Sequence, residues 1–243
     1  MHIHIGCSGY HYDDWKGSFY PPGLPKEKWL DYYARHFNTV EINNSFYNLP
    51  DKDKIKHWLD QTPDEFRFTF KAHRYLTHMK KLKADDKFRQ RMDAFLDALH
   101  PAEKRISNIL WQLPGNLHKN PERLHNFCTL LKKSYSHIIE FRHTSWFDDE
   151  IYDILRSHNI GICMLSSPGD MPEKVIATGT TAYLRLHGKE EWYNYKYSKQ
   201  ELGNWKMRLN KLKEVRDLFI CFNNDQQAFA PQNAREMMAM YED

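Results

Sequence analysis

The feature that most constrains this chain is a strand-like run followed by a helix-like stretch, a unit that recurs about eight times. The runs are rich in β-branched and aromatic residues, and between most of them apolar residues recur at three- and four-residue spacing. Uninterrupted strand–helix alternation requires parallel strands joined by crossovers. The expected strands cover residues 2–8, 39–46, 66–73, 106–113, 137–143, 160–166, 181–187 and 217–224.

Eight consecutive units of this kind predict an α/β fold, a TIM (β/α)₈ barrel, with an open doubly wound sheet as the competing architecture. The unit after the sixth strand is expected to be degenerate, because residues 168–173 lead only to a short helical stretch around residues 174–178. No Gly/Ser-rich linker, low-complexity tract or exact repeat divides the chain. Residues 1–243 are therefore predicted to form a single domain.

Composition excludes several classes of protein. No apolar run approaches the ~18 residues of a membrane span, so no membrane partner is expected. The first residues enter a strand pattern directly, without the basic and apolar regions of a signal peptide, which predicts a cytoplasmic protein. The formal net charge of +3 is too small to indicate nucleic-acid binding by itself. The four cysteines form no CxxC pair and are interpreted as small hydrophobic residues.

Strand alternation predicts which side chains point into the barrel. In the second strand Val40 and Ile42 share one face, whereas Glu41, Asn43 and Ser45 share the other. The purely apolar face suits the helix layer, so the polar face must point inward, toward the mouth where barrel enzymes build their sites. The polar side chains expected to face inward in five strands are Glu41, Asn43, Ser45, Thr69, Lys71, His73, Glu140, Arg142, Arg185, His187, Asn223 and Asp225.

The charges on this inner face favour an anionic ligand. Three cations, Lys71, Arg142 and Arg185, face the carboxylates Glu41 and Glu140, which leaves a surplus of roughly one positive charge. Guanidinium groups suit the oxygens of carboxylates and phosphates. The alternative interpretation is an internal ion-pair network with a purely structural role.

A metal site is the less favoured interpretation. Carboxylates and histidines on the inner face are ligand types that a divalent ion accepts, but neither His73 nor His187 stands in an HxH or HExxH spacing and the neighbouring cations would repel the metal. GxGxxG, P-loop and GxSxG motifs are also absent from the sequence, and Ser8 is interpreted as a turn residue. We therefore predict neither a metal nor a cofactor.

Aromatic residues are concentrated in the loops expected over the same mouth. They include Tyr10, Tyr12 and Trp15 in the first loop, Trp146 in the fifth, and a run from Trp192 through Tyr195 in the seventh. Aromatic faces interleaved with lysine are able to stack on bases or sugars. The alternative is that these loops pack on each other and roof the barrel.

Short segments that span nearly the whole chain in order match a known family pattern. They are residues 5–10, 15–17, 19–21, 40–47, 70–72, 77–78, 112–114, 140–143, 145–146, 185–188, 222–225 and 230–231. These segments resemble the YecE-like family, the domain of unknown function with family number 72, from which Gly115 departs, where a second proline is expected. The resemblance implies a TIM-barrel fold and no particular reaction. Barrels of this family resemble endonuclease-IV-like and sugar isomerase proteins, which suggests a nucleic-acid or sugar ligand by analogy alone.

The leading hypothesis is a protein that binds, without a metal, a small anionic ligand such as a phosphorylated sugar or a nucleotide-like molecule. The sequence leaves open whether it is an enzyme; if so, it is expected to be a hydrolase, lyase or isomerase, with Glu41 or Glu140 as general base and His187 as acid. The alternatives are a nucleic-acid-binding or -processing protein and a non-catalytic metabolite-binding regulator; the oligomeric state is open. The predicted ligand-binding residues are Asn43, Lys71, His73, Gln112, Arg142, Trp146, Arg185, Trp192, Tyr195, Asn223 and Asn224.

Overall fold

The computed structural model describes residues 1–242 and contains a closed barrel of eight parallel strands in chain order. Each strand pairs with the next, and β1 closes the barrel on β8 along six residue pairs, from His2 opposite Asp217 to Cys7 opposite Phe222. The predicted TIM barrel is thereby confirmed. The strands are β1 (His2–Ser8), β2 (Thr39–Ile42), β3 (Arg67–Lys71), β4 (Ile106–Gln112), β5 (His137–Glu140), β6 (Gly161–Ser166), β7 (Thr181–Leu186) and β8 (Asp217–Phe222).

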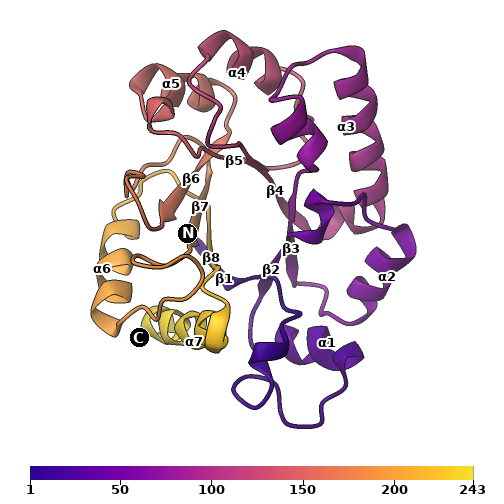
Figure 1. Ribbon diagram of the computed structural model, residues 1–243, viewed down its shortest axis with the longest axis vertical. Helices are drawn as coiled ribbons and strands as arrows, with labels where there is room; N and C mark the ends of the chain where they lie inside the picture. The colour runs from indigo at the N-terminus through magenta and orange to yellow at the C-terminus, as the bar shows by residue number, and fades with distance from the viewer. Residues whose placement is uncertain (243) are drawn as a thin grey trace.

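Helices surround the strands in chain order, as Figure 1 shows. Short 3₁₀ turns follow several strands, and a π-helical turn at Tyr75–Met79 follows β3. Within residues 1–242 no helix is long and apolar enough to cross a membrane. The α-helices are α1 (Trp29–Ala34), α2 (Lys52–Asp60), α3 (Asp86–Leu99), α4 (Pro121–Cys128), α5 (Asp149–Ser157), α6 (Lys199–Leu209) and α7 (Phe229–Glu242).

The connection between β6 and β7 contains no helix in the part of the chain described here, so the expected degenerate unit is confirmed. The short helical stretch expected at residues 174–178 was wrong, because this segment is irregular. Its end is tied to the start of β6, where the Thr178 hydroxyl donates to the Ile160 carbonyl (2.6 Å) and accepts from the Ile162 amide (2.8 Å). These bonds hold the backbone against the strand instead of letting it coil.

Helix starts follow the sequence signals. The Ser198 hydroxyl accepts from the Glu201 amide, and the Glu201 carboxylate accepts from the Ser198 amide, which is the capping box that the spacing predicts. Asp148 caps α5 by accepting from the Glu150 amide. Such caps satisfy amides that have no partner inside the helix. They fix where each helix begins, and so how long each strand-to-helix loop is.

The strands end earlier than the sequence suggests. β2 stops at Ile42, where residues Asn44–Phe46 form a 3₁₀ turn, and β5 stops at Glu140 instead of continuing to residue 143. The polar residues after these points leave the hydrogen-bonded ladder. Their directions therefore depend on the loops as well as on strand alternation.

The predicted alternation is confirmed within the strands. Outward residues such as Phe68, Phe70 and Ile220 pack in the large core between barrel and helices. A second, smaller apolar cluster fills the barrel itself, and we call it the apolar plug. It consists of Leu110, Ile138, Cys163, Leu165, Tyr183, Phe219 and Cys221.

Candidate functional site

A cavity of about 540 Å³ opens at the C-terminal ends of the strands. Inward-facing residues from six strand ends contribute to it, together with loop residues. It brings together Asn43, Lys71, Gln112, Arg142, Arg185, His187 and Asn223 from the predicted set. The other lining residues are Tyr12, Tyr47, His78, Leu113, Pro114, Gly115, Tyr193 and Asp225.

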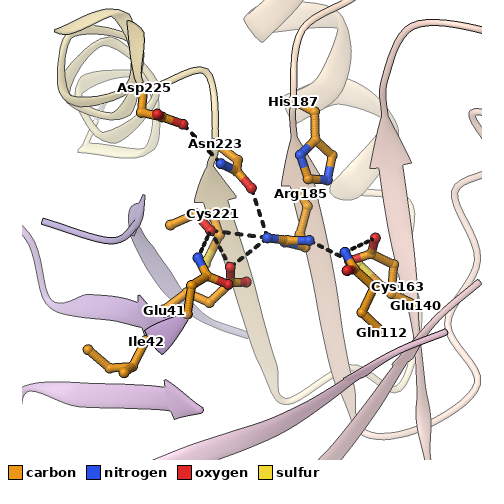
Figure 2. A network of polar contacts seen from close by, with 12 residues as sticks. Glu41, Ile42, Gln112, Glu140, Cys163, Arg185, His187, Cys221, Asn223 and Asp225 are labelled. Atoms are coloured by element: carbon orange, nitrogen blue, oxygen red, sulfur yellow. Dashed lines mark hydrogen bonds and ion pairs between the residues drawn. The ribbon is translucent and has the colours of Figure 1, made fainter. Parts of the chain in front are cut away.

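Arg185 lies at the floor of this cavity and is 1% exposed. Figure 2 shows its guanidinium group between two carboxylates. Nη1 donates to Glu140 Oε2 at 2.6 Å, and Nη2 donates to Glu41 Oε1 at 2.7 Å and to Asn223 Oδ1 at 2.8 Å. Both carboxylates are fully buried, so this bridge compensates charges that would otherwise be very unfavourable.

Ser8 and Tyr183 complete the partners of Glu41. The Ser8 hydroxyl donates to Glu41 and accepts from Asn43 Nδ2 at 2.7 Å, and the Tyr183 hydroxyl donates to Glu41 Oε2 at 2.9 Å. The interpretation of Ser8 as a turn residue was wrong, because it ends β1 and is buried in this network. Strand alternation applied to β1 would have placed Ser8 inward, on the same face as His4 and Gly6.

Glu140 is saturated with donors in the same way. Arg142 Nε, Arg185 Nη1 and Gln112 Nε2 (2.8 Å) all donate to it. Burial alone would raise the pKa of Glu140, but the guanidinium groups of Arg142 and Arg185 outweigh it and hold the pKa well below its usual range. Glu140 therefore stays ionised and is a weak proton acceptor, which does not suit the predicted role of general base.

Arg142 connects this network to His187. Its Nη2 lies 3.2 Å from His187 Nε2, and its guanidinium stacks 4.9 Å from the ring centre of Trp192. Burial, reinforced by Arg185 and Arg142, holds the pKa of His187 well below its usual range, so the imidazole is neutral near pH 7. Because Arg142 can only donate, Nε2 of His187 must accept. The ring proton is then on Nδ1, a buried atom with no protein partner among the described residues.

Lys71 ends β3 and lines the cavity beside this network. No carboxylate of the described residues lies within ion-pair distance of its ammonium group, whose closest recorded partner is the Phe46 ring at 4.4 Å. Burial, together with the charge of Arg185, lowers the pKa of Lys71 to about 8. The cavity thus holds a cation whose charge no protein group neutralises directly.

Asp225 follows β8 and also lines the cavity, where Asn223 Nδ2 donates to it at 3.0 Å. Burial raises the pKa of Asp225 to about 6. The predicted surplus of one positive charge did not count this carboxyl. Three cations face three carboxylates once Asp225 is ionised, so the surplus exists only while Asp225 is protonated.

Two predicted residues beyond the strand ends lie outside the cavity. His73 is buried, where its Nδ1 accepts from the Tyr75 amide and its Nε2 lies near Arg91 of α3. Asn224 is buried as well and donates to the Tyr195 carbonyl at 2.7 Å. His73 follows the last ladder residue of β3 and turns away from the inward face that alternation predicts, whereas Asn224 has the outward parity of Ile220 and Phe222 in β8.

The predicted aromatic residues differ in how closely they approach the cavity. Trp146 is buried, stacks on Phe141 at 4.8 Å and donates to the Leu117 carbonyl, so it covers the outside of the barrel. The hydroxyl of Tyr195 is directed to Glu201 of α6. Trp192 approaches the cavity only through Arg142 and His187.

Two tyrosines that the predicted ligand-binding set left out form the rim, although Tyr193 belongs to the aromatic run expected over the mouth. Tyr47 is 62% exposed and Tyr193 is 40% exposed, and both line the cavity. Tyr193 adopts a left-handed backbone conformation (φ +67°), which is unfavourable for a bulky residue. Its amide donates to the His187 carbonyl at 2.8 Å and its carbonyl accepts from Gln226, so neighbouring loops hold the strained position. Backbone strain of this kind concentrates at functional sites.

No three His, Cys, Asp or Glu side chains within residues 1–242 are grouped so that they could hold a metal ion. The four cysteines are buried and unpaired. Burial raises the pKa of Cys7, so its thiol is unreactive near neutral pH. The lysine, histidine and aspartate side chains that line the cavity all have shifted pKa values; they are Lys71, His78, His187 and Asp225.

Comparison with known proteins was made on sequence and on structure. The chain is 29% identical to the UPF0759 protein YunF of Bacillus subtilis (strain 168) over 268 residues, which cover 98% of this chain and 94% of that protein. It is 33% identical to the UPF0759 protein YecE of Escherichia coli (strain K12) over 136 residues, covering 51% of this chain and 49% of that protein.

Among solved structures, a DUF72 family protein from Thermotoga maritima matches with a TM-score of 0.90 and 30% identity over 100% of both chains. A DUF72 family protein from Enterococcus faecalis matches with a TM-score of 0.85 over 99% of this chain and 95% of that one; at 20% identity it shows likeness of fold alone. A family model described as "Protein of unknown function DUF72" matches residues 4–243. Both the barrel and the sequence match are continuous from end to end, and the chain belongs to the DUF72 family.

Proposed function

We propose that the cavity binds a small anionic molecule, a phosphorylated sugar or a nucleotide-like compound, without a metal. The unneutralised ammonium group of Lys71 is the observation that carries this proposal. Arg142 adds a second donor, because its recorded contacts use Nε and Nη2 and leave Nη1 without a protein partner among the described residues. Arg185 has a different role, since both its Nη atoms are occupied by Glu41, Glu140 and Asn223.

The exposed tyrosines at the rim favour a ligand that carries a ring as well as an anionic group. Tyr47 and Tyr193 present large apolar surfaces to solvent at the mouth, where an aromatic face can stack on a base or a sugar. The anionic group would lie deeper, near Lys71 and Arg142. This arrangement places charge at the floor and apolar contact at the entrance, as is common in small-molecule sites.

Proton transfer in this cavity is best assigned to Asp225 and His187. A carboxyl with a pKa of about 6 exchanges protons readily near neutral pH, whereas Glu140 does not. The neutral His187 ring lines the same cavity, and its Nδ1 has no protein partner among the described residues. Glu41 and Glu140 then serve to hold Arg185 and Arg142 in place. Acting as an enzyme, the protein would use general acid–base catalysis as a hydrolase, lyase or isomerase.

The direct test is thermal denaturation with inorganic phosphate, ribose 5-phosphate and AMP. A ligand at one hundred times its Kd stabilises the folded state by about 2.7 kcal/mol, which raises Tm by several degrees. Lys71→Met should remove most of this stabilisation, whereas Lys213→Met, at an exposed position, should leave it unchanged. Absence of stabilisation by every anion would overturn the proposal. A turnover assay with the stabilising compound then separates an enzyme from a regulator that only binds.

A further inference from the structure

Lys71 is the only amine among the described residues that line the cavity. We propose that it acts as a nucleophile and forms an imine with a carbonyl group of the bound ligand. This inference rests on the proposed function, because it uses the same cavity and the same anionic class of ligand. It adds a covalent step and narrows that class to carbonyl compounds that carry an anionic group.

The contacts of the two nearby glutamates explain why Lys71 is not locked in an ion pair. Glu140 accepts from Arg142, Arg185 and Gln112, and its oxygens are fully engaged. Glu41 accepts from Arg185 and from two hydroxyl groups. An amine paired with a carboxylate stays protonated and has no free lone pair. Lys71 has no such pair, and so it remains available for reaction.

The charges around Lys71 favour its neutral form. Two guanidinium groups oppose two carboxylates that they themselves neutralise, and both neighbouring histidines are uncharged near pH 7 because burial lowers the pKa of each, that of His78 to about 4. With a pKa of about 8, roughly one Lys71 amine in ten is unprotonated at pH 7, against fewer than one in a thousand for an ordinary lysine. The charged and titratable groups that face Lys71 are Glu41, Glu140, Arg142, Arg185, His78 and His187.

The step balances without an added oxidant or reductant. The Nζ lone pair of Lys71 attacks the carbonyl carbon, the carbonyl π bond breaks, and its oxygen takes up the proton that the nitrogen loses, which gives a carbinolamine. The C–O bond then breaks, and the hydroxyl leaves as water with a proton from Asp225, whose carboxyl lines the same cavity. The nitrogen lone pair forms the C=N bond and keeps its remaining proton, which gives the protonated imine. Asp225 regains a proton when water hydrolyses the imine.

Reductive trapping tests the inference on the intact protein. Sodium borohydride converts an imine into a stable secondary amine, so Lys71 should gain the mass of the probe minus one oxygen atom. Three probes separate the sources of the anionic group: pyruvate carries a carboxylate, dihydroxyacetone phosphate carries a phosphate, and acetone carries neither. Peptide mass spectrometry locates the modified lysine. We expect at least tenfold faster trapping at Lys71 than at the exposed Lys213 with an anionic probe, and competition by inorganic phosphate.

The control variant is Lys71→Arg, which keeps a positive charge and lacks a nucleophilic amine. It should retain stabilisation by phosphate while losing all trapping at position 71. Trapping at Lys71 no faster than at Lys213, in protein that phosphate stabilises, would overturn the imine step and leave the proposed function standing. Failure of phosphate to stabilise the protein, with no trapping either, would overturn both. Equal trapping by acetone and the anionic probes would contradict the narrowed ligand class.

Discussion

Two parts of the barrel interior lie on the same strand faces and differ in chemistry. Tyr183, Ile138 and Leu110 belong to the apolar plug, and two residues later along the same strands come Arg185, Glu140 and Gln112. Successive inward positions are about 6–7 Å apart along a strand. The next inward position toward the C-terminal end of each strand therefore replaces apolar packing with a dense ionic network.

Within the barrel, the side chains that stabilise the fold by apolar packing are separate from the side chains that carry charge. The plug buries apolar surface, which stabilises the fold without directional requirements. The buried ionic network of Glu41, Glu140, Arg142 and Arg185, which we call the polar layer, is stable only while every buried charge keeps its partners. Those partners fix each side chain in place. Lys71, at the edge of this layer, has no carboxylate partner among the described residues, and it lines the cavity where we propose that a ligand binds.

Removing the central cation of the polar layer should lower the free energy of unfolding more than the other substitutions do. Arg185→Met leaves Glu41 and Glu140 without their shared cation, and we expect a loss of about 3–5 kcal/mol in the free energy of unfolding, measured by urea denaturation. Adding Glu41→Gln and Glu140→Gln to the same variant should recover much of this loss, because no buried charge is then unpaired. A single variant as stable as the wild type would contradict the role of Arg185 as the central cation.

Breaking the apolar plug should cost less and should not depend on pH. Leu110→Ala removes buried methyl groups and leaves a void, so we expect a loss of roughly 2–5 kcal/mol. The loss should be the same near pH 5 and near pH 8, since no titratable group is removed. A loss that changes with pH in this range would show that the plug and the polar layer are coupled.

Asp225 extends the comparison of the two layers, because burial of its ionised carboxylate lowers the free energy of unfolding. Its pKa is raised to about 6 in the folded protein, so the stability it contributes is fully present below the unfolded pKa near 3.8 and is lost as pH rises through about 6. Asp225→Asn should therefore raise the free energy of unfolding by roughly 1–2 kcal/mol near pH 8 and leave it unchanged near pH 4. Urea denaturation at both pH values checks the sign, and a variant less stable at pH 8 would refute it.

The smallest effect is expected for a substitution at the rim of the cavity, where only ligand binding should change. Tyr193→Ala should weaken binding of AMP about tenfold and leave binding of inorganic phosphate unchanged, because only the ring of the ligand contacts the tyrosine. Tyr195→Ala is the matched control in the same loop, since the Tyr195 hydroxyl is directed to Glu201. Isothermal titration of both ligands measures the difference. Equal losses for AMP and phosphate would assign Tyr193 a purely structural role.

Strand alternation predicted which polar side chains meet inside the barrel. Glu41, Glu140 and Arg185 were placed inward by alternation alone, and they meet as expected. Beyond the ladders the outcome was mixed: Arg142 and Asn223 line the cavity as alternation predicts, whereas His73 turns toward α3. It also missed Tyr193, because nothing in an aromatic run distinguishes the ring that reaches the mouth from those that pack elsewhere.

The sequence by itself determined the barrel, its degenerate sixth unit and the polar face of each strand, because hydrophobic periodicity is a local property of the chain. Only the tertiary structure decided which charges neutralise one another. Pairing depends on distances between strands far apart in sequence, such as the 2.7 Å contact between Glu41 of β2 and Arg185 of β7. That pairing leaves Lys71 without a carboxylate partner among the described residues, and burial in the folded protein raises the pKa of Asp225.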